Sequence, residues 1–398
     1  MKLVYLKNLL VSLFNKKIDL LNGFTGKTMF LGRFIGYLNP LTFNHTVANA
    51  TVVNAQGNMF RVNNPYAPAT TLNLKGQMHA HTTNSDGSYS LTETINVYKN
   101  AGYDFVAITD HNVVTDTSYS MPDGMVWIGN AYEDTRNTAG WQHMNIYKSP
   151  IPVGVTSIYQ TTNTPLSLRN HFAPKYPICF NHPEDEVVYA SDAFINALPY
   201  GIAFVECYNS CVTTYMGEVA TTSALPTNAL YGDTYLCRAD NKQYRNAGHN
   251  LNSPNWVVNS WEFGNIERAF PMLLDKGFRI WGLAVDDFHF MTIFNRGWVQ
   301  VFCNNKTKED IWNSLLNGNF YACAGLTINK PVLNQDNWEI TATESGCTFT
   351  FYGFGNEVLQ QTTGTSAKYY FTGNEKYVRC VVSKGRKKAW VQPISFCI

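Results

Sequence analysis

Two histidines one residue apart, His79 and His81, are followed by the carboxylate of Asp86. If this segment is a strand, side chains at alternate positions share a face, so both imidazoles can point at one ion. Imidazoles and carboxylates are common metal ligands in proteins. A His-x-His pair often arises by chance, so the prediction of a metal site depends on further ligands at later strand ends.

Such ligands recur along the chain, beside short apolar segments at 105–109, 125–129, 143–147, 176–180, 201–205 and 278–285. The polar residues that open or follow these segments are Asp110, His111, Glu133, His143, His182, Glu206, Asp287 and His289. Chance placement would not give six segments with such ends. Ligands drawn from several strand ends are typical of a β/α barrel.

The elements that must position the ligands can also be predicted. Residues 91–101 are expected to form a helix, capped by Ser90 with Glu93 at the third helical position and ended by Gly102. Residues 105–109 are continuously apolar, as in a buried parallel strand. A second capped helix is expected over 307–318, and alternating residues in 348–352 and 377–382 predict an antiparallel sandwich.

These patterns divide the chain into three parts. Residues 1–73 are expected to hold an amphipathic helix over 1–24 and then an Asn/Thr-rich arm of irregular or short-stranded structure. Residues 74–325 are expected to form the barrel, with an insertion at 210–260 on the ligand face. Residues 326–398 form the predicted β domain. A long arm of this kind needs something to hold it, such as other copies in a homo-oligomer or larger assembly.

Composition excludes several classes of function. The net charge is +1 and 15% of the residues are charged, so the chain has no electrostatic footprint for nucleic acid or an anionic membrane. No apolar run is long enough to span a bilayer. Nine cysteines without CxxC spacing predict reduced thiols and, with no convincing signal peptide, a cytoplasmic location. Cys207 and Cys211 are interpreted as core or insertion residues rather than ligands.

The order of these motifs resembles that of the PHP (polymerase and histidinol phosphatase) superfamily of metal-dependent phosphoesterases. The resemblance rests on His79-x-His81 with Asp86-Gly87, Asp110-His111-Asn112, Glu133, His143, Asn181-His182-Pro183 and Asp287-x-His289. It spans roughly residues 74–398 and includes 318–325 and, in the tail, 377–379 and 389–394, which resemble a small β domain appended in one subgroup. It implies a distorted, seven-stranded β/α barrel that binds up to three divalent metals.

The resemblance also implies which residues hold each ion. The first metal would be held by His79, His81, Glu133 and Asp287, the second by Glu133, His143 and His182, and the third by Asp86, His111 and His289. Mixed imidazole and carboxylate ligands favour Mn²⁺, Fe²⁺ or Zn²⁺. Asp110 is expected to orient a ligand histidine, and Arg296 is predicted to contact phosphate.

These inferences predict a hydrolase that cleaves a phosphomonoester or phosphodiester through a metal-bridging hydroxide. An alternative is a structural or assembly protein, for example a virion or appendage component, that carries this domain. Its basis is the charge-poor arm, which lies outside the family pattern. Both hypotheses can be correct if the chain is an enzyme that processes a phosphate-containing surface polymer. Its location would then be the virion.

Overall fold

The computed structural model describes ten ranges of the chain: residues 47–117, 121–135, 143–149, 176–182, 202–212, 235–238, 242–245, 258–259, 269–275 and 277–396. The helix expected over 1–24 lies outside these ranges, as does most of the insertion expected over 210–260. Of that insertion, the backbone of a three-stranded sheet is described, made of β9 (Tyr235–Arg238), β10 (Lys242–Arg245) and β11 (Val258–Asn259).

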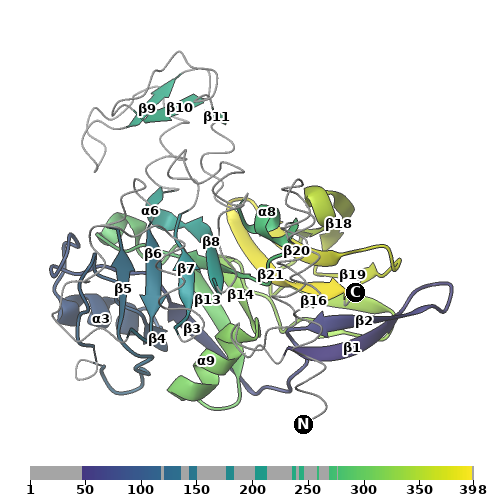
Figure 1. Ribbon diagram of the computed structural model, residues 1–398, viewed down its shortest axis with the longest axis horizontal. Coiled ribbons are helices and arrows are strands. Elements are labelled where there is room, and N and C mark those ends of the chain that lie inside the picture. Colours follow the sequence, from purple (N-terminus) through teal and green to yellow (C-terminus); the bar gives the residue numbers. More distant parts are fainter. Residues whose placement is uncertain are drawn as a thin grey trace, which may run out of the picture. The chain divides into compact units, whose positions relative to one another are not determined.

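A five-stranded sheet carries several of the predicted ligands (Figure 1). Its order is β12 (Trp281–Val285), β8 (Phe204–Asn209), β7 (Ile178–Phe180), β6 (Met144–Tyr147) and β5 (Ala131–Asp134). Neighbours from β12 to β7 are parallel, whereas β6 runs antiparallel to both β7 and β5. Almost all residues of these strands are buried, as expected from the many apolar residues in their sequences.

A ten-stranded sheet contains β3 (Leu72–Gln77) and the parallel strand β4 (Phe105–Val106) at one end. The sheet continues through β13 (Trp298–Cys303), β14 (Phe320–Ala324), β21 (Lys387–Phe396), β20 (Tyr377–Lys384), β17 (Cys347–Tyr352) and β18 (Val358–Gly364). The hairpin of β1 (Ala48–Val53) and β2 (Met59–Asn64) joins it through β21. This part of the arm therefore consists of short strands, which is one of the two forms expected for it.

Two isolated parallel bridges connect these sheets. Ala80, beyond β3, pairs with Phe288, beyond β12, and His111, beyond β4, pairs with Glu133 of β5. Backbone hydrogen bonds reinforce both connections, from the His81 amide to the Phe288 carbonyl at 2.9 Å and from the Asn112 amide to the Glu133 carbonyl at 2.8 Å. Each bridge includes or adjoins predicted ligands, so the backbone itself holds the two sets of strand ends together.

The C-terminal strands enclose an apolar core of their own. A three-stranded antiparallel sheet, β15 (Val332–Leu333), β16 (Asn337–Thr341) and β19 (Ser366–Tyr370), packs against β17 and β20. Trp338 of β16 lies against Phe351 of β17, with ring centroids 6.1 Å apart. Because β17, β20 and β21 share one sheet with β14, β13 and β3, the ladder runs without interruption from this core to the ligand-bearing strand β3.

Helices are few in the described ranges. The α-helices are α3 (Leu91–Asn100), α6 (Ser210–Val212), α8 (Ala269–Asp275) and α9 (Lys308–Leu316), and the 3-10 helices are η5 (Met291–Ile293) and η6 (Phe354–Asn356). The capping box of Ser90 and Glu93 is confirmed, and Gly102 follows α3 with φ of +76°. Thr307 caps α9, as predicted. None of the described helices combines the length and apolar character that a membrane crossing requires.

The architecture is therefore mixed α/β but mostly sheet. Continuous hydrogen bonding defines two large sheets joined by bridges, so the predicted seven-stranded β/α barrel is not confirmed as one closed sheet. The boundaries at 73, 210–260 and 325 stay predictions.

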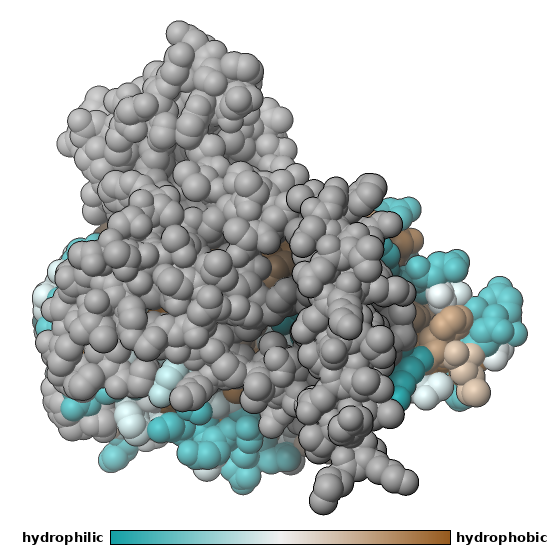
Figure 2. Space-filling view, in the orientation of Figure 1, coloured by the Kyte–Doolittle hydropathy of each residue, from teal (hydrophilic) through white to brown (hydrophobic). Residues whose placement is uncertain are grey.

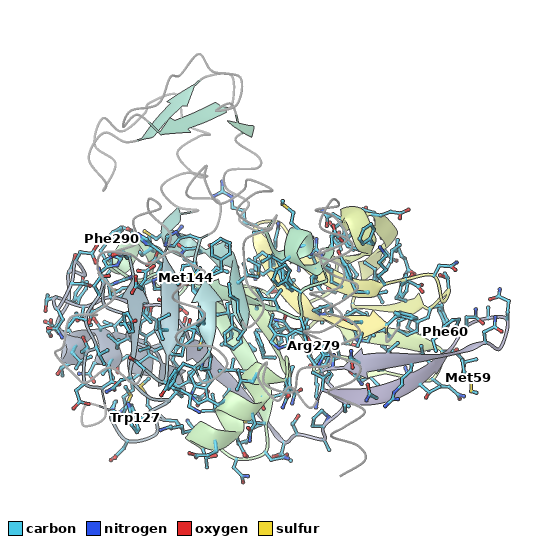
Figure 3. All side chains as sticks on the ribbon, in the orientation of Figure 1. Met59, Phe60, Trp127, Met144, Arg279 and Phe290 are labelled. Carbon is cyan, nitrogen blue, oxygen red and sulfur yellow. The ribbon has the colours of Figure 1, made fainter. Side chains whose placement is uncertain are left out.

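The hairpin of β1 and β2 exposes an apolar side chain, whereas the sequence of the arm is mostly polar. Met59 is 73% exposed, and Figure 3 labels it beside Phe60 on the projecting hairpin. Figure 2 shows a pale brown patch in this region among mostly hydrophilic described residues. Single exposed apolar residues are normal on protein surfaces, so this patch does not by itself indicate a partner.

We expect Gly76→Ala to destabilise the junction between β3 and β4. A Cβ at Gly76 would lie 1.9 Å from Cζ of the buried Phe105 ring, so the ring must move. Overpacking of this kind costs about 1–3 kcal/mol in free energy of unfolding, measurable by urea denaturation. The same substitution in a Phe105→Leu background should cost less; an equal cost in both backgrounds would contradict this packing.

Candidate metal centre

The two histidines of the opening motif lie just beyond β3, where the chain remains extended. Their alternation is explained by packing: Met78 and Ala80 join apolar clusters, whereas His79 and His81 turn toward the other ligands. Both imidazoles are fully buried, and their Nε2 atoms lie 3.0 Å apart. A strand end with period-two alternation thus delivers two ligands to one place.

Asp86 reaches the same place from a tight loop. The amide of Gly87 donates to the Thr82 carbonyl, and a Cβ at Gly87 would lie 2.6 Å from the His81 carbonyl carbon, so the turn favours glycine. The Asp86 carboxylate lies 3.3 Å from Nε2 of both His111 and His289. Its side chain is 47% exposed, which places it at the open edge of the cluster.

Glu133 of β5 lies at the centre of the cluster and is almost completely buried. Oε2 lies 3.3 Å from Nε2 of both His79 and His81, and 3.0 Å from Nδ1 of His111. Oε1 lies 3.1 Å from Nδ1 of His143 and 3.4 Å from Nε2 of His182. One carboxylate therefore contacts histidines from five different positions.

Asp287 completes the cluster from the end of β12. Oδ1 lies 3.2 Å from Nε2 of His79 and 3.1 Å from Nε2 of His81. Oδ2 accepts a hydrogen bond of 3.1 Å from the Asn209 amide group. Asp287 has φ of +52°, a strained backbone conformation for a residue other than glycine, and such strain is concentrated at functional sites.

All nine predicted ligands lie in the described ranges, and the structure brings all nine together. Four groups within the cluster have ligand atoms within 4.8 Å of one another: His81–Asp86–His111–His289, His79–His81–Glu133, His111–Glu133–His143 and Cys211–Asp287–His289. These groups overlap the predicted sets but do not coincide with them: His182 belongs to none of the groups, His111 joins Glu133 and His143, and Asp287 lies with His289. His81 also belongs with the expected ligands of the third metal, and Cys211, interpreted from sequence as a core or insertion residue, joins a group.

The donor set fits divalent cations. Buried polar atoms without a hydrogen bond of good geometry include Nδ1 of His111, Oε2 of Glu133, Nδ1 of His143, Oδ1 of Asp287 and Nε2 of His289. Buried polar groups are normally hydrogen-bonded, so several orphaned donors and acceptors in one cluster indicate a missing common partner. A cation with imidazole and carboxylate ligands would satisfy all of them.

Several residues outside this set orient the ligands. The Glu206 carboxylate, fully buried at the end of an apolar run, lies 2.7 Å from Nδ1 of His79 and also accepts from the His182 amide. Asn181 donates to Oε1 of Glu133 at 2.8 Å. Carboxylates that hold the second nitrogen of a ligand histidine fix its tautomer and orientation. The position of Glu206 directly after an apolar run could be seen in the sequence, but its contact with His79 could not be predicted.

Asp110 lies beside the loop that carries Asp86. Within the described structure its carboxylate accepts from the Thr82 amide at 2.7 Å and from the hydroxyls of Thr82, Ser85 and Thr115, not from a histidine. Ser85 in turn lies 3.3 Å from Nδ1 of His81. Asp110 therefore anchors the loop that carries Asp86 and reaches His81 through Ser85. Its role in orienting a ligand histidine stays a prediction.

Arg296 lies in the loop between β12 and β13. Its backbone amide donates to Oδ1 of Asp286, whose carboxylate also accepts from the amides of Asn295 and Gly297. This ties the loop to the residue that precedes Asp287. A contact between the Arg296 side chain and phosphate stays a prediction.

The electrostatics of the cluster favour charged carboxylates and raise the pKa of several imidazoles, whereas burial lowers the pKa of His143. Burial opposes protonation of His79, but Asp287, Glu133 and Glu206 outweigh it and raise its pKa well above the ordinary value. Burial likewise opposes protonation of His111, yet Glu133 and Asp86 raise its pKa to about 10. Burial disfavours the Glu133 anion, but the surrounding histidines lower its pKa well below the usual range. Protons and cations therefore compete for the same donor atoms.

Comparisons with known proteins give little further information. No family model and no curated protein matches the chain. Among solved structures, one similar chain is a two-domain protein containing a predicted PHP-like metal-dependent phosphoesterase from Bacteroides vulgatus ATCC 8482. It is 15% identical, with a TM-score of 0.40, over 79% of this chain and 92% of the other. Because this similarity is low, the assignment of metal ligands rests on the geometry of this chain alone.

We expect Asp86→Ala to remove one metal equivalent and leave the pair around Glu133 occupied. The carboxylate lies at the exposed edge, against His111 and His289, whereas Glu133 keeps its own histidines. Elemental analysis of the purified, metal-loaded variant measures the loss, with the exposed Asp123→Ala as the matched control. A full metal complement in Asp86→Ala would refute the assignment.

We expect Glu206→Gln to weaken metal binding by about 10- to 100-fold, because the charge that orients His79 is removed while the side-chain size is kept. Calorimetric titration with Zn²⁺ measures the affinity. Glu339→Gln, in a partly exposed pair with Lys368 far along the chain, serves as the control. Equal affinities for the two variants would show that Glu206 does not support the centre.

Proposed function

We propose that the chain is a metal-dependent phosphoesterase of the PHP type that hydrolyses a phosphomonoester or phosphodiester. One observation carries this proposal: nine imidazole and carboxylate side chains from several strand ends and loops converge in one cluster, and most of them are buried. A structural core would not collect so many titratable groups, since each costs free energy to bury unless a partner compensates it.

We assign the ions to the ligand sets inferred from the sequence, with His81 shared between the first and third. Glu133 would bridge two ions, because its oxygens face different histidines: Oε2 faces His79, and Oε1 faces His143. When bound, paired divalent ions supply Lewis-acid stabilisation of phosphoryl oxygens and acidify a water molecule. Mn²⁺, Fe²⁺ and Zn²⁺ suit this mixture of nitrogen and oxygen ligands.

The exposure of the ligands indicates the side from which substrate enters. His79 and His81 are fully buried, whereas the side chains of His111 and His143 are 22% and 17% exposed and that of Asp86 is 47% exposed. A phosphate ester would approach across this open edge and be oriented there. Glu206, Asp110 and Asn181 would keep the buried ligands in place during the reaction.

The fold supports the same proposal. Following the chain of pairings, β3, β4, β5, β6, β7, β8 and β12 form a ring if the two isolated bridges are counted as contacts between neighbours. We propose that these strands are a distorted, open form of the seven-stranded barrel. Its ligands would then lie at one rim, as catalytic residues do in β/α barrels.

The alternative role in a virion or appendage rests on residues 1–73, of which 47–73 are described. The hairpin of β1 and β2 packs on β21 of the same chain, so this part of the arm is held without a partner. We therefore favour the enzymatic proposal.

We expect purified protein to hydrolyse an aryl phosphate, or an aryl phosphodiester, when loaded with Mn²⁺, Fe²⁺ or Zn²⁺, and to lose this activity on chelation. Glu133→Gln should lower kcat/KM by at least about a hundredfold, because even groups that only support ligands matter by 10- to 100-fold. The exposed Glu357→Gln is the control.

The comparison of monoester with diester identifies the substrate class. A metal-loaded protein that hydrolyses neither ester would refute the proposed function, as would full activity in Glu133→Gln.

A further inference from the structure

Cys211 lies at the edge of the cluster and has no place in the ligand sets described above. It belongs to the short helix α6, which directly follows β8. Its amide donates to the Asp286 carbonyl at 3.1 Å, and the neighbouring Ser210 hydroxyl donates to the Ile293 carbonyl at 2.8 Å. The backbone around Cys211 is therefore fixed beside the residue that precedes the ligand Asp287.

The Cys211 side chain shares its surroundings with two of the ligands. Its sulfur lies within 4.8 Å of ligand atoms of both Asp287 and His289, and all three residues are buried. Cys207, on the preceding strand, gives a contrast: it packs in an apolar cluster, and its thiol donates to the Leu283 carbonyl. Two neighbouring cysteines thus occupy chemically different environments, one apolar and one lined with metal-binding groups.

Both residues beside Cys211 present atoms that need a partner. Nδ1 of His289 lies 2.8 Å from the Asp287 carbonyl oxygen and donates to it, which leaves Nε2 as the ligand atom. Nε2 of His289 and Oδ1 of Asp287 both lack a hydrogen bond of good geometry despite burial. A cation between them would satisfy both atoms, and the Cys211 sulfur lies within reach of the same position.

We propose that the thiolate of Cys211 is an additional ligand of the third ion, the one assigned to Asp86, His111 and His289, and that Asp287 is shared between this ion and the first. The inference rests on the proposed metal centre and extends it, because thiolate is not one of the ligand types assigned above. On binding, the thiol proton passes to solvent and a metal–sulfur bond forms, with no change in oxidation state.

A sulfur ligand changes which ion the site prefers. Soft thiolate favours Zn²⁺ or Fe²⁺ over Mn²⁺, whereas a site of carboxylates and imidazoles alone discriminates less between them. The position nearest His289 is therefore expected to select zinc or iron, while the pair around Glu133 accepts manganese as well. A mixed complement of metals would follow from the ligands of one chain.

Titration of the full chain with Co²⁺ tests this proposal spectroscopically. Thiolate bound to Co²⁺ gives a near-ultraviolet charge-transfer band that nitrogen and oxygen ligands do not give, whereas visible d–d bands report Co²⁺ binding of any kind. Among the described residues, Cys211 is the one cysteine in a candidate metal group. We expect both types of band in the wild-type chain.

The outcomes separate this inference from the proposed function. Visible bands without a charge-transfer band would overturn the role of Cys211 while leaving the metal centre intact. Failure to bind Co²⁺ at all would overturn both. A charge-transfer band in the wild-type chain supports the proposal before any variant is made.

Substitutions then identify the cysteine that gives the charge-transfer band. Cys211→Ser and Cys211→Ala should both abolish it and retain the visible bands, whereas Cys207→Ser, the matched buried control, should retain both. The ratio of Zn²⁺ to Mn²⁺ affinity should fall by at least about tenfold in Cys211→Ser. Persistence of the band in both Cys211 variants, or an unchanged affinity ratio, would contradict the proposal.

Discussion

The buried carboxylate of Glu133 is the interaction on which the rest of the site depends. An anion in the protein interior is costly unless charged or strongly polar groups compensate it. Glu133 is surrounded by histidines that arrive from the ends of β3, β4 and β7 and from the start of β6. Its own strand therefore has to lie where those ends meet, and the bridge between His111 and Glu133 fixes that position through the backbone.

The same requirement explains the layers of support around the ligands. Ions held by several side chains need those side chains in fixed orientations, and flexible ligands would lose entropy on binding. Glu206 fixes His79, Asn181 fixes Glu133, and Asn209 fixes Asp287. Asp110 holds the loop of Asp86 through hydroxyl groups, so even the most exposed ligand is connected to a buried side chain. The centre is rigid where it is buried and open at one edge.

Much of the ligand set could be predicted from the sequence because metal chemistry restricts residue types and strand geometry restricts spacing. His79 and His81 had to share a face, and Asp287-x-His289 had the same signature at a later strand end. The capping box of Ser90 and Glu93 could be predicted in the same way, because its two residues are three positions apart in the sequence. Such features depend on neighbours in the chain, which a sequence displays directly.

Other features depend on contacts between distant segments and were missed. Cys211 resembled a core residue until the packing of α6 placed it beside His289. The hydroxyl groups of Thr82 and Ser85 that bind Asp110 were also not predicted, because they depend on the fold of the loop over 82–87. The antiparallel course of β6 and the continuous sheet from β18 to β4 were likewise not predicted, because strand pairing over long separations leaves no local signature.

The central claim is that this cluster is a multi-metal centre built around Glu133. Anomalous diffraction from crystals of the metal-loaded protein, recorded at the absorption edges of Mn, Fe and Zn, tests it most directly. We expect at least two anomalous peaks within the cluster, one on each side of the Glu133 carboxylate and both within ligand distance of the histidines that surround it. Metal-loaded crystals with no anomalous peak among these side chains would contradict it.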